Sequence, residues 1–434
     1  MVFVHHLEKV WQMLCKSHRL VQKNKARTVP ACQRKDLNMK KKERIFECKM
    51  LRPTRAEINL DYLKHNIKEV KKAVKKNTIV CAVLKADGYG HGAVEIAKTL
   101  LDNGADRFAV AILSEAIQLR KAGLDVPILV LGYTPDEQVG LILDYNLTQT
   151  VYSLDQARYF SKVAGTMKRI MQIHVIVDTG MSRLGFQATE EELTVVKEVF
   201  KLDNIYVEGM YTHFAVADIK DKTFTYQQYN QFINFTNELE KEGFNIEIKH
   251  VSNSAAIIDI PEMNLDMVRA GIMLYGLYPS KEVNQEKIIL KPVMTLKTKV
   301  AHSKKLPAGR GVSYGLIYKT KEESNIVTLP IGYADGFTRM LTNKAEVTIK
   351  GEKLPVIGKI CMDQSMVDAT GIEVIRGDEV IIFGEDEKKV NTVDTLALKL
   401  GTINYEIVCM VGRRVPRVYI EDNIIVKVRD YVLE

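Results

Sequence analysis

The 434-residue sequence lacks any run that approaches the roughly 18 consecutive apolar residues of a membrane-spanning helix. Its six cysteines include no CxxC pair, and half of them stand in apolar surroundings. This pattern is typical of reduced thiols and favours a cytoplasmic protein over a disulfide framework. The first residues also lack the apolar core and the small-residue cleavage site of a secretory signal.

Most of the chain lacks an excess of charge of either sign, although the net charge is +8. Residues 1–50 hold 13 of the 62 Lys and Arg and 4 of the 54 Asp and Glu, a net charge of +9. Residues 51–434 therefore have a net charge of −1, which gives no argument for a nucleic-acid surface there. This body of the chain also has no internal repeat and no low-complexity tract.

Residues 1–50 form a basic extension without the patterning of a globular domain. A targeting peptide or a nucleic-acid-binding arm is one interpretation of it. The interpretation that we favour is a disordered extension or a start that is not the natural one. Met39 and Met50 are both candidate starts, since globular patterning begins at Leu51.

Strand and helix signals alternate along the first half of the body. Arg55–Leu60 alternates like a strand, and Asp61 is placed to cap a helix expected over Tyr62–Lys76. Eight apolar runs typical of buried strands then follow, most of them separated by helical patterns, at 78–84, 107–113, 128–131, 148–152, 172–177, 206–211, 246–251 and 265–270. Eight such units favour an N-terminal (β/α)8 TIM-type barrel over an open sheet.

The pattern changes near Leu290, where short alternating strands separated by glycines and turn pairs begin. We therefore predict a barrel domain at 51–290 and a β-rich C-terminal domain at 291–434. Lys281–Lys291 reads as a hinge, and one helix is expected over Thr392–Leu400. The strands expected in the second domain are 293–301, 326–329, 345–349, 355–360, 379–383, 417–420 and 424–428.

The stretch Ala82–Gly92 places Lys85 directly after a buried strand and before three glycines. Glycines permit tight turns and a close approach of the backbone to a ligand. A lysine at the end of a barrel strand can be desolvated, which lowers its pKa and frees the amine to form a Schiff base. The alternative is a lysine that extends to water beside a flexible turn. The stretch by itself does not decide between them.

The ends of four other expected strands also carry polar residues, and barrel enzymes keep their sites at such loops. Asn253 and Ser254 open a short helix next to Gly271, where a barrel commonly holds a phosphate. A nucleophilic lysine with a phosphate cradle indicates pyridoxal 5′-phosphate. Each residue also has a simpler explanation, since Asn253 and Ser254 can merely cap a helix and His213 can be a satisfied core histidine. The conjunction of five loops favours a site.

These motifs resemble those of the alanine racemases, which are fold-type III pyridoxal-phosphate enzymes. The resemblance runs from about Leu51 to about Val428 and leaves residues 1–50 without a counterpart. Its motifs are Ala82–Gly92, Asp178–Gly185, Thr212–Ala215, Val268–Gly276, Val312–Gly315, Pro330–Gly336, Gly358–Gln364 and Asn404–Glu406.

The resemblance implies a homodimer with shared active sites that racemises alanine by a two-base mechanism. Lys85 would bind the cofactor and act as one base, and Tyr314 of the partner subunit would be the other. Arg269 would contact the pyridine nitrogen, and His213 would bridge Arg269 and Tyr314. The implied cofactor-binding set is Lys85, Tyr89, Arg183, His213, Asn253, Ser254, Arg269, Gly271, Ile272 and Tyr405, and the implied substrate-binding set is Arg183, Tyr333 and Met362. No metal is implied.

The sequence departs from the family at Ile176. Many members have a carbamylated lysine at this position, two residues before the Asp-Thr-Gly turn, where it orients the arginine equivalent to Arg183. This chain lacks that anionic group, so another acceptor or a bound anion such as chloride is expected to replace it.

Three other functions remain open at this stage. The chain could racemise another small amino acid such as serine, or it could be a non-catalytic barrel that binds pyridoxal phosphate. The second class usually lacks the β-rich domain, whereas Tyr314, Tyr333 and Met362 are all present here. A decarboxylase would be expected to place a carboxylate at the pyridine nitrogen, where this chain has Arg269. Alanine racemisation, supplying D-alanine for peptidoglycan, is the function that we predict.

We predict that residues 1–50 are dispensable. A chain that starts at Met50 should be soluble and should keep the activity of the full chain, because all the motifs lie after it. Comparing the two purified proteins checks this, and an insoluble or inactive short chain would contradict it.

Overall fold

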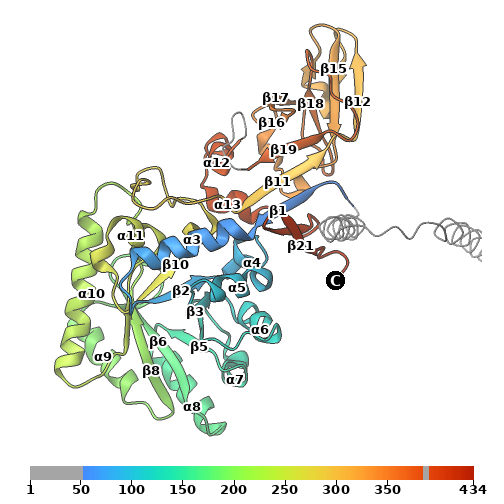
Figure 1. Ribbon diagram of the computed structural model, residues 1–434. Coiled ribbons are helices and arrows are strands. Elements are labelled where there is room, and N and C mark those ends of the chain that lie inside the picture. Colours follow the sequence, from blue (N-terminus) through green and yellow to red (C-terminus); the bar gives the residue numbers. More distant parts are fainter. Residues whose placement is uncertain (1–51, 385–390) are drawn as a thin grey trace, which may run out of the picture. The chain divides into compact units, whose positions relative to one another are not determined.

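The computed structural model describes residues 52–384 and 391–434, which belong to one compact unit that begins at Met50 (Figure 1). The predictions for the basic extension 1–50 lie outside the described residues. Within the described part of the chain, no helix is both long and apolar enough to cross a membrane.

Eight parallel strands form a nearly closed barrel in the order β10-β2-β3-β4-β5-β6-β8-β9 (Figure 1). The ring closes through the backbone, where Arg269 N donates to Ser252 O (3.0 Å) and Asp266 N donates to Lys249 O (3.1 Å). All eight predicted strands and the barrel class are confirmed. The strands are β2 (Ile79–Val83), β3 (Arg107–Val110), β4 (Ile128–Val130), β5 (Thr148–Val151), β6 (Met171–Asp178), β8 (Ile205–Tyr211), β9 (Ile248–His250) and β10 (Met267–Ala270).

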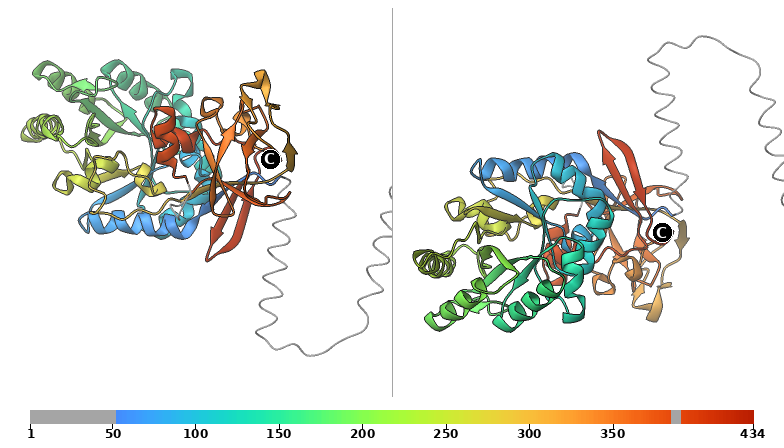
Figure 2. Two further views of the ribbon diagram at one scale, coloured as in Figure 1. Left: turned by 90° about the horizontal axis from the view of Figure 1, so that it is seen from above. Right: turned by 90° about the horizontal axis from the view of Figure 1, so that it is seen from below.

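Helices surround these strands, as the views in Figures 1 and 2 both show. Polar N-caps start several of them; the side chain of Thr189, for example, accepts a hydrogen bond from the backbone N–H of Glu192 at the start of α9. The helices are α3 (Leu60–Ala73), α4 (Lys85–Tyr89), α5 (Ala93–Asp102), α6 (Leu113–Lys121), α7 (Val139–Asp144), α8 (Leu154–Thr166), α9 (Glu190–Phe200), α10 (Thr223–Lys241) and α11 (Ser254–Asp259).

The predicted cap of α3 is wrong. Asn59, and not Asp61, is the N-cap, and its side chain accepts from the backbone N–H of Tyr62 (3.0 Å). Asp61 instead lies in the first turn of the helix, where its carboxylate accepts from Lys64 (2.9 Å). Both residues can cap a helix, so the pattern alone placed the start two residues too late.

The chain from Met294 onward forms a ten-stranded sheet together with one strand from before the barrel, which confirms the predicted β-rich domain. Strand β1 (Arg55–Asn59) belongs to this sheet, between β11 and β20, although it precedes the whole barrel in sequence. The other strands of the sheet are β11 (Met294–Lys299), β12 (His302–Leu306), β15 (Ser324–Leu329), β16 (Glu346–Ile349), β17 (Glu352–Ile357), β18 (Ser365–Asp368), β19 (Glu379–Phe383), β20 (Arg417–Glu421) and β21 (Ile424–Arg429).

A second helix of this domain, α13 (Asn404–Cys409), was not predicted. The expected helix is α12 (Val393–Leu400), which ends at Gly401 in the left-handed conformation. Six residues give too short a helical period to be recognised in sequence. The helix α13 contacts α4 of the barrel (Figures 1 and 2), so it brings residues of the second domain to the end of β2.

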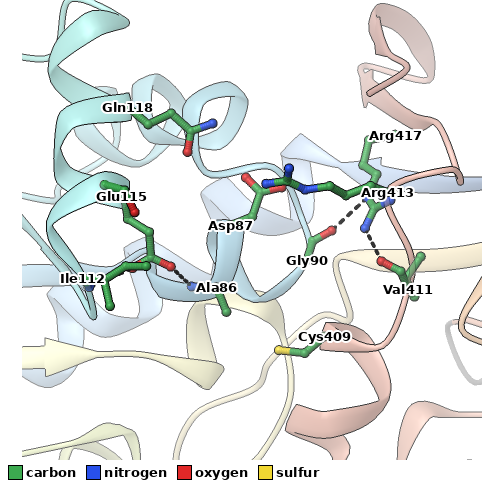
Figure 3. A pocket seen from close by; sticks show the side chains of 11 residues that line it. Ala86, Asp87, Gly90, Ile112, Glu115, Gln118, Cys409, Val411, Arg413 and Arg417 are labelled. Carbon is green, nitrogen blue, oxygen red and sulfur yellow. Dashed lines mark hydrogen bonds between the residues drawn. The ribbon is translucent and has the colours of Figure 1, made fainter. Parts of the chain in front are cut away.

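Arg417 of β20 ties the second sheet to the loop after Lys85. Its buried guanidinium donates to the backbone oxygen of Gly90 (3.0 Å), as well as to those of Val411 and Val415 (2.6 Å each). Figure 3 shows this arginine beside Gly90. Because its donors are satisfied by backbone oxygens from both domains, the arginine holds the turn after β2 in place.

Candidate active site

A cavity of about 550 Å³ opens at the carboxyl ends of the barrel strands. It gathers residues that are far apart in the sequence, from the loops after β2, β6, β8, β9 and β10 and from α13. Ten of the thirteen predicted site residues line it, namely Lys85, Tyr89, Arg183, His213, Asn253, Ser254, Arg269, Gly271, Ile272 and Tyr405.

The turn after Lys85 is a left-handed helical turn. Residues Ala86, Asp87, Gly88 and Tyr89 have φ values of 54°, 54°, 62° and 52°. Such a conformation costs roughly 1–2 kcal/mol for each residue that has a Cβ, so it persists only where the surroundings hold it. The turn leaves Lys85 and Tyr89 both facing the cavity.

Two carboxylates hold this turn. Asp87 accepts from the backbone N–H of Ala93 (2.9 Å) and from the hydroxyl of Tyr431 (2.6 Å). Glu115, at the start of α6, accepts from the backbone N–H of Ala86 (2.6 Å), as Figure 3 shows. Hydrogen bonds to ionised carboxylates are stronger than neutral ones, and these bonds offset part of the strain. Glu115 was not among the predicted site residues, since its only signal in the sequence is its position in the first turn of a helix.

The pKa of Lys85 is lowered from its usual value, chiefly by burial and next by the charge of Arg183, while Glu115 opposes the shift. A lowered pKa increases the fraction of neutral, nucleophilic amine at neutral pH. The shift therefore favours the neutral amine of Lys85, which is the form that attacks an aldehyde.

Arg269 lies on β10, and both of its terminal nitrogens have hydrogen-bond partners. Its Nη1 contacts His250 Nδ1 (2.6 Å) and donates to His250 O (3.1 Å). Its Nη2 donates to Thr212 O (2.8 Å) and Val251 O (3.0 Å) and contacts His213 Nδ1 (3.2 Å). Its Nε makes no hydrogen bond to any residue that the structure describes, and the side chain lines the cavity.

His213 is neutral in this environment. Burial lowers its pKa to about 3, and the charges of Arg269 and Arg183 act in the same direction. Since the guanidinium can only donate, His213 Nδ1 accepts from Arg269, and the ring proton is on Nε2. The predicted contact of His213 with Arg269 is present.

The hydroxyl groups of Tyr89 and Ser254 lie close to Gly271 in another part of the cavity lining. A Cβ at Gly271 would lie 3.0 Å from the hydroxyl oxygen of Tyr89 and 3.6 Å from Ser254 Oγ, so a side chain there would crowd the Tyr89 hydroxyl. Ser254 Oγ accepts from Gly271 N (3.0 Å), which leaves its own proton free to donate. The ring of Tyr405 lies 6.1 Å from that of Tyr89.

Asn253 caps a helix, which is one of the two roles that the sequence allowed for it. Its side-chain oxygen accepts from the backbone N–H of Ala256 (3.1 Å) and caps α11, while the residue also lines the cavity. Arg183 is exposed and makes no ion pair with a described carboxylate. Ile176, beside it in the cavity lining, is buried and apolar.

The structure places Tyr314, Tyr333 and Met362 away from the cavity of their own chain. Their side chains are exposed, Tyr314 to 69%. The three lie together on the second domain, because Tyr333 N donates to Cys361 O (3.0 Å) and a separate groove is lined by Tyr314 and Cys361. A single chain therefore holds two separate parts of the predicted site.

Comparisons with known proteins cover almost all of the described chain. Models of the alanine racemase N-terminal domain and C-terminal domain match residues 58–279 and 293–419. The chain is 50% identical to alanine racemase 1 of Clostridium acetobutylicum over 383 residues, which are 88% of this chain and 99% of that protein. It is 51% identical to an alanine racemase of Methanococcus maripaludis over 369 residues, 85% of this chain and 99% of the relative.

Solved structures are similar over the same extent. The alanine racemase of Clostridium difficile 630 has a TM-score of 0.85 at 48% identity, covering 88% of this chain and 100% of its own. The alanine racemase of Bacillus anthracis with bound L-Ala-P has a TM-score of 0.85 at 35% identity, covering 88% and 99%.

The titration of Lys85 should respond in opposite directions to its two charged neighbours. The Arg183→Ala variant should raise the pKa of Lys85, because the guanidinium charge lowers it, and Glu115→Gln should lower it further. The midpoint of the pH dependence of acetylation at Lys85, resolved by mass spectrometry, measures this. The exposed Lys162 in the same spectra is the control, and midpoints that move in one direction for both variants would contradict the assignment.

Proposed function

Because this chain belongs to the alanine racemase family, as its motifs indicated, and is an alanine racemase, we propose that it uses pyridoxal 5′-phosphate. The cofactor would be bound at the mouth of the barrel through Lys85. The observation that carries this proposal is the grouping of an activated lysine, a free arginine donor and a hydroxyl cradle around one cavity. The D-alanine product would enter peptidoglycan, and the free thiols of Cys81, Cys361 and Cys409 suit a reducing cytoplasm.

The residues of the cavity fit this cofactor. Lys85 would bind its aldehyde carbon, and the hydroxyls of Tyr89 and Ser254 beside Gly271 would hold its phosphate. The unpartnered Nε of Arg269 would donate to its ring nitrogen. When bound, pyridoxal phosphate withdraws electrons from the Cα of an attached amino acid and so acidifies the α-proton.

Arg269 would donate a hydrogen bond without giving up its proton. Burial lowers its pKa only to about 10, which leaves the guanidinium charged at neutral pH. A carboxylate at this place would instead favour a protonated ring nitrogen and stronger electron withdrawal. The arginine therefore limits how strongly the α-carbon is activated, which suits an enzyme that returns a proton to the same carbon.

Inversion at Cα requires a proton to leave from one face and another to arrive at the opposite face. Lys85, with its lowered pKa, would act on one face. The base for the other face would be Tyr314 of the partner subunit, because the cavity of the same chain does not include Tyr314. A phenol has a reference pKa of about 10, so it needs cationic neighbours to act as a base, and Arg269 and Arg183 would provide them.

Racemisation of alanine is tested by incubating the purified protein and cofactor with L- or D-alanine and following the ellipticity. The signal should fall to zero from both enantiomers, and Lys85→Ala should abolish the change. Loss of optical activity from serine alone would favour the alternative of a serine racemase, while no change with either amino acid would favour a non-catalytic protein.

Shared active sites make a specific prediction for mixed dimers. In a dimer of one Lys85→Ala chain and one Tyr314→Phe chain, one site has both substitutions and the other has neither. A heterodimer purified through two different tags should therefore regain about half of the wild-type activity per dimer. The two single-variant homodimers are the controls, and an inactive heterodimer would show that Tyr314 serves its own chain.

A bound anion such as chloride would hold Arg183, because Ile176 cannot be carbamylated and no described carboxylate pairs with the arginine. We expect the racemisation rate to be insensitive to bicarbonate and sensitive to chloride. Titration of each ion into ion-free protein measures this, with Ile176→Lys as a matched variant that should gain a bicarbonate response. A bicarbonate-dependent rate in the unmodified protein would exclude the idea.

A further inference from the structure

A line of buried polar side chains crosses the barrel interior from the cavity to the opposite side. Arg269 Nη1 contacts His250 Nδ1 (2.6 Å), and His250 Nε2 contacts His174 Nδ1 (2.8 Å). His174 Nε2 contacts Glu208 Oε2 (2.7 Å), to which Arg107 Nη2 donates (2.9 Å). These residues come from five different strands, and both histidines are fully buried.

The backbone of β8 has an irregularity at Glu208 that serves this line of side chains. In the pairing of β6 with β8, Ile173 is opposite Val207 and His174 is opposite Gly209, so Glu208 is an extra residue in a β-bulge. A bulge re-aims a side chain, and here it allows the carboxylate to reach His174. A Cβ at Gly209 would lie 2.5 Å from the backbone oxygen of Ile248 and 2.8 Å from Cε1 of the His174 ring, so both the sheet and the histidine require glycine there.

The hydrogen-bond roles along the line follow from its two ends. The carboxylate of Glu208 can only accept, so His174 Nε2 carries a proton. If His174 is neutral, its Nδ1 accepts from His250 Nε2, and His250 Nδ1 is then the acceptor for Arg269. The guanidinium can only donate, so both ends impose the same tautomers.

The charge states agree with this assignment. Burial lowers the pKa of His174 and of His250, and the charge of Arg269 adds to both shifts. For His174, the hydrogen bond to Glu208 opposes the shift without reversing it. Burial alone would raise the pKa of Glu208, but the hydrogen bonds from His174 and Arg107 outweigh it and lower that pKa to about 2. At neutral pH the carboxylate is ionised and the two imidazoles are uncharged.

We propose that Glu208 is a positioning residue for the reaction, which fixes the tautomers of His174 and His250 and thereby holds Arg269 with its Nε directed into the cavity. The role in the reaction rests on the function proposed above, whereas the tautomers do not. Glu208 is not in the lining of the cavity and is connected to Arg269 only through the two histidines. It acts by requiring His250 to present a lone pair to Arg269, so that the guanidinium keeps one orientation.

The tautomers can be measured directly in the wild-type protein. With ¹⁵N-labelled histidine and cofactor bound, His174 and His250 should each show a protonated Nε2 and an unprotonated Nδ1 at neutral pH. Signals are assigned by single histidine substitutions elsewhere in the chain. A protonated Nδ1 in either ring would overturn the proposal whether or not the protein racemises alanine.

Two matched double variants distinguish the loss of the hydrogen-bond acceptor at position 208 from the loss of the buried charge there. Arg107→Met with Glu208→Gln removes both charges but keeps an oxygen that can accept from His174. Arg107→Met with Glu208→Leu removes the same charges and the acceptor. The Gln variant should keep the wild-type tautomers. The Leu variant should populate the other tautomers as well, because the Nε2 proton of His174 then has no partner and only Arg269 still favours the wild-type arrangement.

The kinetic readout distinguishes orientation of Arg269 from a general loss of structure. The Leu variant should have kcat about 10-fold or more below that of the Gln variant, on the scale at which supporting residues act. Its KM should be unchanged, because Arg183 and the partner subunit hold the substrate. Equal kcat values in two folded variants would overturn the proposal. If neither variant folds, the tautomers of the wild-type protein decide the question.

Discussion

The left-handed turn of Ala86–Tyr89 is the constraint on which the cavity depends. It directs Lys85 and Tyr89 to two different parts of one cavity, which an ordinary loop of five residues would not do. Three residues with a Cβ in this conformation cost free energy that the turn does not recover by itself. The turn is stable because Glu115 and the bond between Asp87 and Ala93 hold it within the barrel, while Tyr431 and Arg417 hold it from the C-terminal part of the chain.

This arrangement explains why the barrel and the second sheet belong to one folded unit. The turn receives hydrogen bonds from β20, and the adjacent α13 adds Tyr405 to the lining of the cavity. Strand β1 lies in the second sheet before the chain enters the barrel, so both ends of the barrel segment are attached to that sheet. A change in the packing between the two parts would therefore alter the position of Lys85.

Charge in the cavity is strongly unbalanced. Lys85, Arg183 and Arg269 line it, with Asp218 as the carboxylate among the lining residues. Burial keeps His213 neutral, so it adds no further positive charge. Burial lowers the pKa of Lys85, and repulsion from Arg183 adds to this shift. The line of side chains that begins at Arg269 contains two neutral histidines and ends at an ionised glutamate. Strand residues that resemble core residues therefore contribute to the electrostatics around the cavity.

Particular residues show what could and could not be predicted. The eight barrel strands were predictable because each is a short apolar run bounded by turn residues, as in Ile128–Val130. The helix α13 was missed because six residues do not establish a period, and the cap of α3 was misplaced because Asn59 and Asp61 are both competent caps. Glu115 and the His174–His250 pair were not recognised, since a buried polar residue gives no sequence signal apart from its position in an apolar run.

The sequence by itself determined the barrel, the β-rich domain and the identity of the residues at the strand ends, because strand length and hydrophobic period are local properties. Resemblance to one family named the roles of Lys85 and Tyr314. Only the tertiary structure decided that β1 joins the second sheet and that the turn after Lys85 is left-handed. These features depend on contacts between residues hundreds of positions apart, such as Arg417 with Gly90, and no local pattern specifies such contacts.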